Sequence, residues 1–189
     1  MKDGPMGTRR KNTRVVTDFP FPPRTTGAWR EISRDQRERW LIAARNRHFK
    51  WMKRRGGWTD APPGSVFCID GAEIADLPAF FCALGEAING PGGYFGRPSL
   101  MSLQDCLFGS FGVTLPFVLQ IMNVDACRTN LGGRALAEWA RSRIAAGDFP
   151  DEEGEQWLLD AERDGRGGDR SLLDEVLDVL RFHGVTIEL

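Results

Sequence analysis

Three short apolar segments separated by helical sequence constrain the fold of this chain most strongly. Each has the length of a β-strand: VFCID begins at Val66, PFVLQIMN at Pro116 and VTIEL at Val185. Parallel neighbouring strands need a crossover connection, usually a helix, whereas antiparallel neighbours can be joined by a short turn. The alternation therefore predicts an α/β fold with a three-stranded parallel sheet. The continuous apolar character of the first two segments predicts strands that are buried on both faces.

Helix-capping signals place helices between these strands. Asp76 is a candidate N-cap, followed by Pro78 and by apolar residues at helical spacing as far as Ile88. Ser99 can cap a shorter helix that ends at Gly109. Three further helices are expected over residues 134–146, 152–163 and 171–183.

Charge is distributed unevenly along the chain. The formal net charge is −1, but residues 1–60 contain 16 Lys or Arg and 6 Asp or Glu, whereas residues 61–189 contain 9 Arg and 20 Asp or Glu. Such an asymmetry indicates that the two parts have different partners or attract each other. We interpret residues 1–60 as a basic extension and residues 61–189 as the main domain.

The basic extension divides further. Residues 1–28 have no helical or strand period and are expected to be extended or disordered. Residues 33–56 predict a helix, because Ser33 and Gln36 can form a capping box at its start. Apolar residues recur on one side of this helix, and we expect that side to face the main domain. The members of this stripe are Trp40, Ala44, His48 and Trp51.

The same helix is rich in basic residues, which allows a second interpretation. Cationic side chains can contact phosphates while an aromatic ring stacks on a base. The residues that could bind nucleic acid in this way are Arg47, Lys50, Trp51, Lys53, Arg54 and Arg55. Docking on the acidic domain and binding of nucleic acid are therefore both open for this helix.

The sequence offers little material for catalysis or metal binding. The two histidines, His48 and His183, do not have metal-ligand spacing, and the common phosphate-binding, zinc-protease and nucleophile-elbow motifs do not occur. Four cysteines lie singly in apolar contexts without a CxxC pair, which predicts buried thiols. They are Cys68, Cys82, Cys106 and Cys127. We therefore expect a protein that is not an enzyme and that has no metal and no cofactor.

Signals for membrane insertion or export are not evident. No apolar run reaches the roughly 20 residues that span a bilayer. The first ten residues lack the apolar core of a secretory signal. We expect a cytoplasmic protein that does not contact the membrane.

Several short motifs occur in the order, and at nearly the spacing, of one known family. The most specific are IDG at residues 69–71, YFG at residues 94–96 and DCL at residues 105–107. Over about residues 66–125 and 171–189, the chain resembles the barstar family of intracellular ribonuclease inhibitors. The resemblance implies a small fold with a three-stranded parallel sheet, and a helix that enters a ribonuclease active site together with the loop before it.

The resemblance also implies a site and a partner. A ribonuclease holds the phosphate of RNA with cationic side chains, and a carboxylate on a rigid helix can take the place of that phosphate. Asp105 corresponds to the central acid of the family, and Tyr94 would pack over the rim of the nuclease site. The implied partner-contact residues are Asp105, Tyr94, Phe95, Gly96, Met101, Ser102 and Gln104. The expected partner is a basic ribonuclease or RNase toxin domain, bound in a 1:1 complex.

The chain departs from the family pattern near the implied site. The loop between Gly96 and Asp105 is one residue longer, Met101 stands where a second acid is usual, and Gln104 replaces an aromatic residue. Removing one member of a charge-paired interface leaves its partner unpaired. The departures therefore predict that the target differs from the nuclease of the family's best-known member.

Two segments have no equivalent in the family. Residues 126–170 are longer than the corresponding connection and are treated as an insertion, and the basic extension has no counterpart. The first interpretation is a ribonuclease inhibitor or immunity protein. The alternative is a nucleic-acid-binding or regulatory protein that uses the basic helix, with the barstar-like domain as an interaction module.

Overall fold

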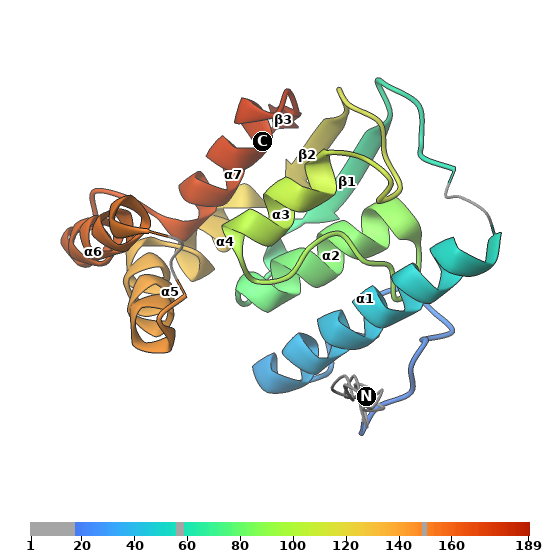
Figure 1. Cartoon of the computed structure of the whole chain (residues 1–189), viewed down its shortest axis with the longest axis horizontal. Helices are drawn as coiled ribbons and strands as arrows, with labels where there is room; N and C mark the ends of the chain where they lie inside the picture. Colours follow the sequence, from blue (N-terminus) through green and yellow to red (C-terminus); the bar gives the residue numbers. More distant parts are fainter. Residues whose placement is uncertain (1–17, 56–58, 149–150) are drawn as a thin grey trace, which may run out of the picture.

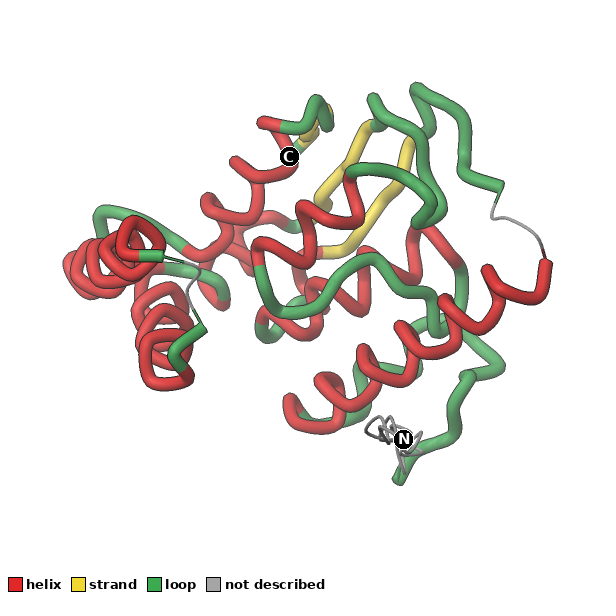
Figure 2. The backbone as a smooth tube through the Cα atoms, viewed as in Figure 1, coloured by secondary structure: helices red, strands yellow, loops and turns green. Residues whose placement is uncertain are grey.

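Three parallel strands form one sheet in the order β1-β2-β3. Seven α-helices and one 3-10 helix accompany it in the part of the chain that the computed structural model describes, residues 18–55, 59–148 and 151–189 (Figures 1 and 2). The predicted α/β architecture is therefore confirmed. In chain order the elements are α1 (Arg34–Arg55), β1 (Val66–Asp70), η1 (Gly71–Glu73), α2 (Leu77–Asn89), α3 (Leu100–Leu107), β2 (Val118–Met122), α4 (Val124–Asn130), α5 (Gly133–Ala146), α6 (Glu152–Gly167), α7 (Leu172–Phe182) and β3 (Thr186–Glu188).

One face of the sheet is buried and the other is exposed. Val66, Val118 and Thr186 lie side by side in the register of the three strands. Side chains alternate in direction along a strand, so Leu119 and Ile121 are buried under the helices while Val66, on the other face, is 57% exposed. The prediction of strands buried on both faces was wrong, because the described helices cover one face.

The same alternation separates the cysteines. Cys68 shares the open face with Val66 and is exposed, whereas the other three thiols are buried. Burial raises the pKa of Cys106 to about 12 and that of Cys127 to about 11, so both are uncharged at neutral pH. The prediction of buried thiols is confirmed for Cys82, Cys106 and Cys127, and was wrong for Cys68, because its side chain lies on the open face of the sheet.

Helix α2 lies between the sheet and α1 and is buried on most of its surface (Figure 1). Asp76 caps its N-terminus as predicted, because Asp76 Oδ1 accepts a hydrogen bond from Ala79 N at 2.8 Å. Phe80, Phe81 and Leu84 are fully buried. A helix that is apolar nearly all round requires a covering layer on each side, and α1 supplies the second one.

Helix α1 docks on the main domain through the predicted apolar stripe. Its capping box forms, since Gln36 Oε1 accepts from Ser33 N at 2.8 Å and Ser33 Oγ accepts from Gln36 N at 3.3 Å. The stripe is largely covered: Trp40, Ala44 and His48 are buried and Trp51 is half-buried. Docking, one of the two interpretations of this helix, is therefore confirmed.

A buried ion pair joins the start of α1 to the start of α2. Arg37 Nη2 donates to Asp76 Oδ2 at 2.8 Å, and the two side chains are only 10% and 16% exposed. Arg37 Nη1 also donates to Ile32 O at 2.7 Å. The basic extension and the acidic domain thus attract each other within one chain, at a position where water screens the pair weakly.

The hydrophobic core continues across residue 60, where the charge changes sign. Phe19 and Trp29, which precede α1, are buried in the same core as the helices of the main domain. The Phe19 and Trp40 rings lie 5.5 Å apart. Residues 18–28 lack regular helix or strand but pack against α1, whereas residues 1–17 of the predicted extended or disordered segment lie outside the described residues.

Residues 126–170 contain the two predicted helices, α5 and α6, although α6 continues beyond residue 163. The packing of these helices as a hairpin and the short α4 before them were not predicted. Trp139 and Trp157 meet edge to face with ring centroids 5.9 Å apart. The two helices approach closely at glycines: a Cβ on Gly165 would lie 2.6 Å from Gly133 O. Glycine at both positions therefore permits the crossing.

We expect Gly165→Ala to destabilise the protein by about 1–3 kcal/mol, because the added methyl group forces the backbones of α5 and α6 apart. Gly167→Ala, in the same helix, is the matched control, since its Cβ would meet only the flexible Asp169 carboxylate. Both variants gain the helix propensity of alanine, about 1 kcal/mol. Urea denaturation measures the free energy of unfolding of each variant. Equal values for the two variants would disprove the close crossing of α5 and α6.

Candidate functional site

Helix α3 presents one face to the core and one to solvent. Leu103, Cys106 and Leu107 are buried, and the helix packs against α7. The predicted inner face is confirmed at Leu103 and Leu107. Met101, Gln104 and Asp105 lie on its solvent side, and the C-cap residue Phe108 is also exposed.

Asp105 is exposed near the middle of this outer face. Within the described residues it makes no hydrogen bond and no ion pair, in contrast to many acids of the molecule, such as Asp76 and Asp148. Leu103 and Cys106, two residues before and one residue after Asp105, are buried and fix the helix on the core. The carboxylate is therefore carried on a fixed backbone and is available to a cation from outside.

The loop before α3 is buried, which corrects part of the predicted contact surface. Tyr94 is 4% exposed and Phe95 is 0% exposed, so neither can reach a partner in this structure. Gly96 has a φ of 95°, and a Cβ there would lie 2.7 Å from the Phe81 ring. YFG thus shapes the loop, although Phe95 and Gly96 were expected to contact the partner and Tyr94 to pack over the rim of its site.

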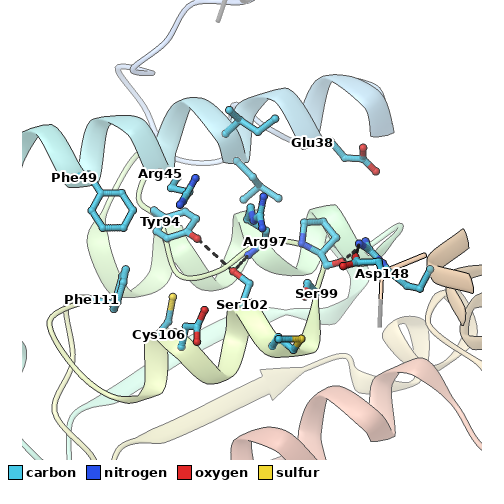
Figure 3. A pocket seen from close by; sticks show the side chains of 16 residues that line it. Glu38, Arg45, Phe49, Tyr94, Arg97, Ser99, Ser102, Cys106, Phe111 and Asp148 are labelled. Atoms are coloured by element: carbon cyan, nitrogen blue, oxygen red, sulfur yellow. Dashed lines mark hydrogen bonds and ion pairs between the residues drawn. The ribbon is translucent and has the colours of Figure 1, made fainter. Parts of the chain in front are cut away.

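Ser102 is also buried, at 9% exposure, although it was expected to contact the partner. Its Oγ accepts from Arg97 N at 3.2 Å and lies 3.4 Å from the Tyr94 hydroxyl oxygen (Figure 3). Burial raises the pKa of Tyr94. Of the seven predicted contact residues, the three that are exposed are Met101, Gln104 and Asp105.

A groove separates α1 from α3 (Figure 3). Its cavity volume is about 480 Å³. The α1 wall includes Ile42, Arg45 and Phe49, and the α3 wall includes Met101 and Asp105. The predicted binding helix thus lies in a concave surface, because α1 packs on α2 and extends beside α3.

The hairpin closes one end of the groove. Arg143 of α5 donates to Pro98 O at 2.7 Å and pairs with Asp148 at 2.7 Å, and both charged residues line the groove. Residues of α1, in the basic extension, and of α5 therefore line the same groove as Asp105.

His48 lies under the same region, on the covered side of α1. Its Nε2 is 3.3 Å from Ser110 O, and its ring stacks on Phe111 with centroids 5.0 Å apart and planes 7° apart. Burial lowers the pKa of His48, an effect larger than the opposing influences of Ser110 O and the nearby Asp60 carboxylate. The imidazole is therefore uncharged at neutral pH.

We expect this burial to make the protein less stable in mild acid. Because the pKa of His48 is lower in the folded than in the unfolded state, the unfolded state binds more protons below the ordinary pKa of about 6.5, and stability falls as the pH decreases through that value. The His48→Gln variant retains a donor for Ser110 O but cannot titrate. Between about pH 7.5 and 5.5, the free energy of unfolding of the wild type, measured by urea denaturation, should fall by up to about 1 kcal/mol more than that of the variant. Identical decreases would contradict the burial of an uncharged His48.

The basic residues proposed for nucleic-acid binding are distributed unevenly. Arg47, Lys50 and Lys53 are exposed, although Arg47 also donates to Pro91 O at 2.9 Å. Trp51 is half-buried in the docked stripe. The side chains of Arg54 and Arg55 lie outside the described residues. Binding of nucleic acid by α1 stays a prediction.

The described ranges, residues 18–55, 59–148 and 151–189, contain neither a candidate metal site nor a candidate membrane-spanning helix. There, no cluster of three or more His, Cys, Asp or Glu side chains could hold a metal ion. No helix in those ranges has the length and apolar character needed to cross a membrane.

Phe108 and Phe182, and the residues of α1 and α5 that line the groove with Asp105, were not predicted from the sequence. Phe108, three residues further along the chain, is 76% exposed, and Phe182 at the end of α7 is 85% exposed. Both rings contact the ring of His183, at centroid distances of 5.6 and 5.3 Å. The position of Phe108 one helical turn after Asp105 could have identified it, whereas the residues of α1 and α5 could not be found without the tertiary structure.

Comparisons with protein-family models, with curated proteins and with solved structures found no match for this chain.

Proposed function

We propose that this protein is a barstar-like inhibitor, acting in the cytoplasm, that blocks the active site of a ribonuclease or RNase toxin with the carboxylate of Asp105. The barstar resemblance supplies the expectation, and the observation that supports it most is the state of Asp105. This side chain is exposed and unpaired among the described residues, on a helix whose opposite face is buried. Met101 and Phe108, 61% and 76% exposed, flank it with apolar surface.

An exposed acid between apolar side chains is the arrangement that a protein interface favours. The apolar groups exclude water when the partner binds, and the charge pair then gains strength in the drier environment. A nuclease site that normally holds phosphate supplies the cation. The 9 Arg and 20 acids of residues 61–189 favour rapid encounter with a basic nuclease.

The experiment is a stoichiometric titration of ribonuclease activity. The chain is added to the purified product of the open reading frame next to its own gene, and to a panel of basic bacterial ribonucleases, with a fluorescent RNA substrate. We expect the activity of at least one nuclease to fall linearly to zero at one equivalent of the chain. Unchanged activity of the whole set at a large molar excess would refute the proposal.

A further inference from the structure

The groove between α1 and α3 is a concave surface that includes Asp105 in its lining (Figure 3). We propose that the groove receives a projecting peptide segment of the partner, which carries one large apolar side chain and one acidic group. The inference rests on the proposed function, because it takes the partner to be the nuclease. It adds a second contact beside the one that the Asp105 carboxylate makes in the phosphate site.

The walls of the groove offer apolar surface that nothing in the described chain covers. Ile42 and Phe49 on α1 are 40% and 38% exposed, and Met101 on α3 is 61% exposed. All three line the same cavity of about 480 Å³, which lies in the range of pockets that enclose bound groups. An apolar side chain inserted between the two helices would remove surface of both walls from water.

Two cations beside this apolar surface have no anionic partner among the described residues. The Arg45 guanidinium lies over the Phe49 ring, 5.3 Å from its centroid, and Arg97 follows the buried loop (Figure 3). The third arginine of the groove, Arg143, is already paired with Asp148. A carboxylate placed near Arg45 and Arg97 would form charge-assisted hydrogen bonds, for which the guanidinium group is well suited.

The aromatic rings and acids of the groove favour a polypeptide over a nucleic acid. The Phe49 and Phe111 rings pack edge to face at 6.2 Å, and His48 covers one face of Phe111, so these rings offer few free faces for stacking bases. Asp105 and Glu38 also line the groove. A nucleic acid has a phosphate at every nucleotide and would place some of them against these carboxylates, whereas a peptide with a single acid can place it against Arg45 and Arg97. A peptide segment with both an apolar and an acidic side chain matches the groove better.

The test uses the full-length chain and a phage-displayed library of short random peptides. We expect selection of peptides that combine Asp or Glu with Leu, Ile, Met or an aromatic residue. Arg45→Glu should weaken binding of a selected peptide at least about tenfold in fluorescence anisotropy. The matched control is Lys50→Glu, the same charge change on α1 at an exposed position outside the groove lining, which should change binding less than about twofold.

Failure to select any peptide, or equal weakening by the two variants, would overturn the inference. A labelled single-stranded oligoribonucleotide that binds and loses affinity only with Arg45→Glu would also overturn it, in favour of nucleic acid. The outcomes separate the two proposals. A nuclease inhibited through Asp105 without any groove peptide removes only the groove inference, whereas peptide binding without inhibition of any nuclease removes the proposed function.

Discussion

Replacing Arg37 by methionine is expected to lower the free energy of unfolding by about 3 kcal/mol, a large effect for one residue. The variant keeps the aliphatic bulk but leaves the Asp76 carboxylate, only 16% exposed, without its cation. It also removes the hydrogen bond to Ile32 O. Urea denaturation at neutral pH measures the change, with the m-value as a check that the unfolding reaction stays the same.

Two further variants isolate the cause. Asp76→Asn retains an N-cap side chain for Ala79 N but removes the charge, so it should destabilise by a similar amount if the ion pair is responsible. Arg34→Met is the control on the same helix. Arg34 is exposed, and its Nε lies 3.9 Å from Glu38 Oε1, so the replacement should lower the free energy of unfolding by less than about 0.5 kcal/mol. A loss for Arg37→Met no larger than for Arg34→Met would show that the pair does not hold α1.

Replacing Asp105 by asparagine is expected to weaken binding to the inhibited nuclease at least about 30-fold, which corresponds to about 2 kcal/mol. Asparagine has nearly the same shape and can accept hydrogen bonds, so the loss reports the charge. Since Asp105 is exposed and unpaired among the described residues, its replacement should change the free energy of unfolding by less than about 0.5 kcal/mol.

The control for this variant is Asp125→Asn, on α4. The Asp125 side chain is 94% exposed and, among the described residues, forms its ion pair with Arg128, which is also on the surface. It changes the net charge of the chain by the same amount, so any general effect of charge on association appears in both variants. Isothermal titration calorimetry measures the dissociation constant of each variant with the nuclease. Equal dissociation constants for Asp105→Asn and Asp125→Asn would exclude Asp105 as the central contact.

Local signals in the sequence predicted the elements of the fold well. The caps at Ser33, Asp76 and Ser171 form hydrogen bonds to backbone groups within three residues, so their geometry depends on the adjacent sequence alone. The three strands and their order along the chain followed from the alternation with helices. Their burial did not follow, because an apolar strand such as VFCID has the same sequence pattern whether helices cover one face or two.

The candidate site was predicted only in part for a related reason. Asp105 lies on the outer side of an amphipathic helix, and this position can be deduced from the spacing of Leu103 and Leu107. The resemblance implied that Tyr94 packs over the rim of the nuclease site, but in this chain it is buried beside His48 and Phe111. Contacts between segments distant in sequence decide such burial, and helical or strand periodicity contains no information on them.

The most direct test of the central claim is competition between this chain and RNA for the nuclease. The dissociation constant of the chain is measured at rising concentrations of an oligonucleotide whose 2′-deoxy group at the cleavage position prevents its hydrolysis. If the Asp105 carboxylate occupies the phosphate site, the apparent dissociation constant rises in proportion to oligonucleotide concentration, without a plateau. A dissociation constant that levels off, with nuclease, chain and oligonucleotide in one complex, would contradict the account.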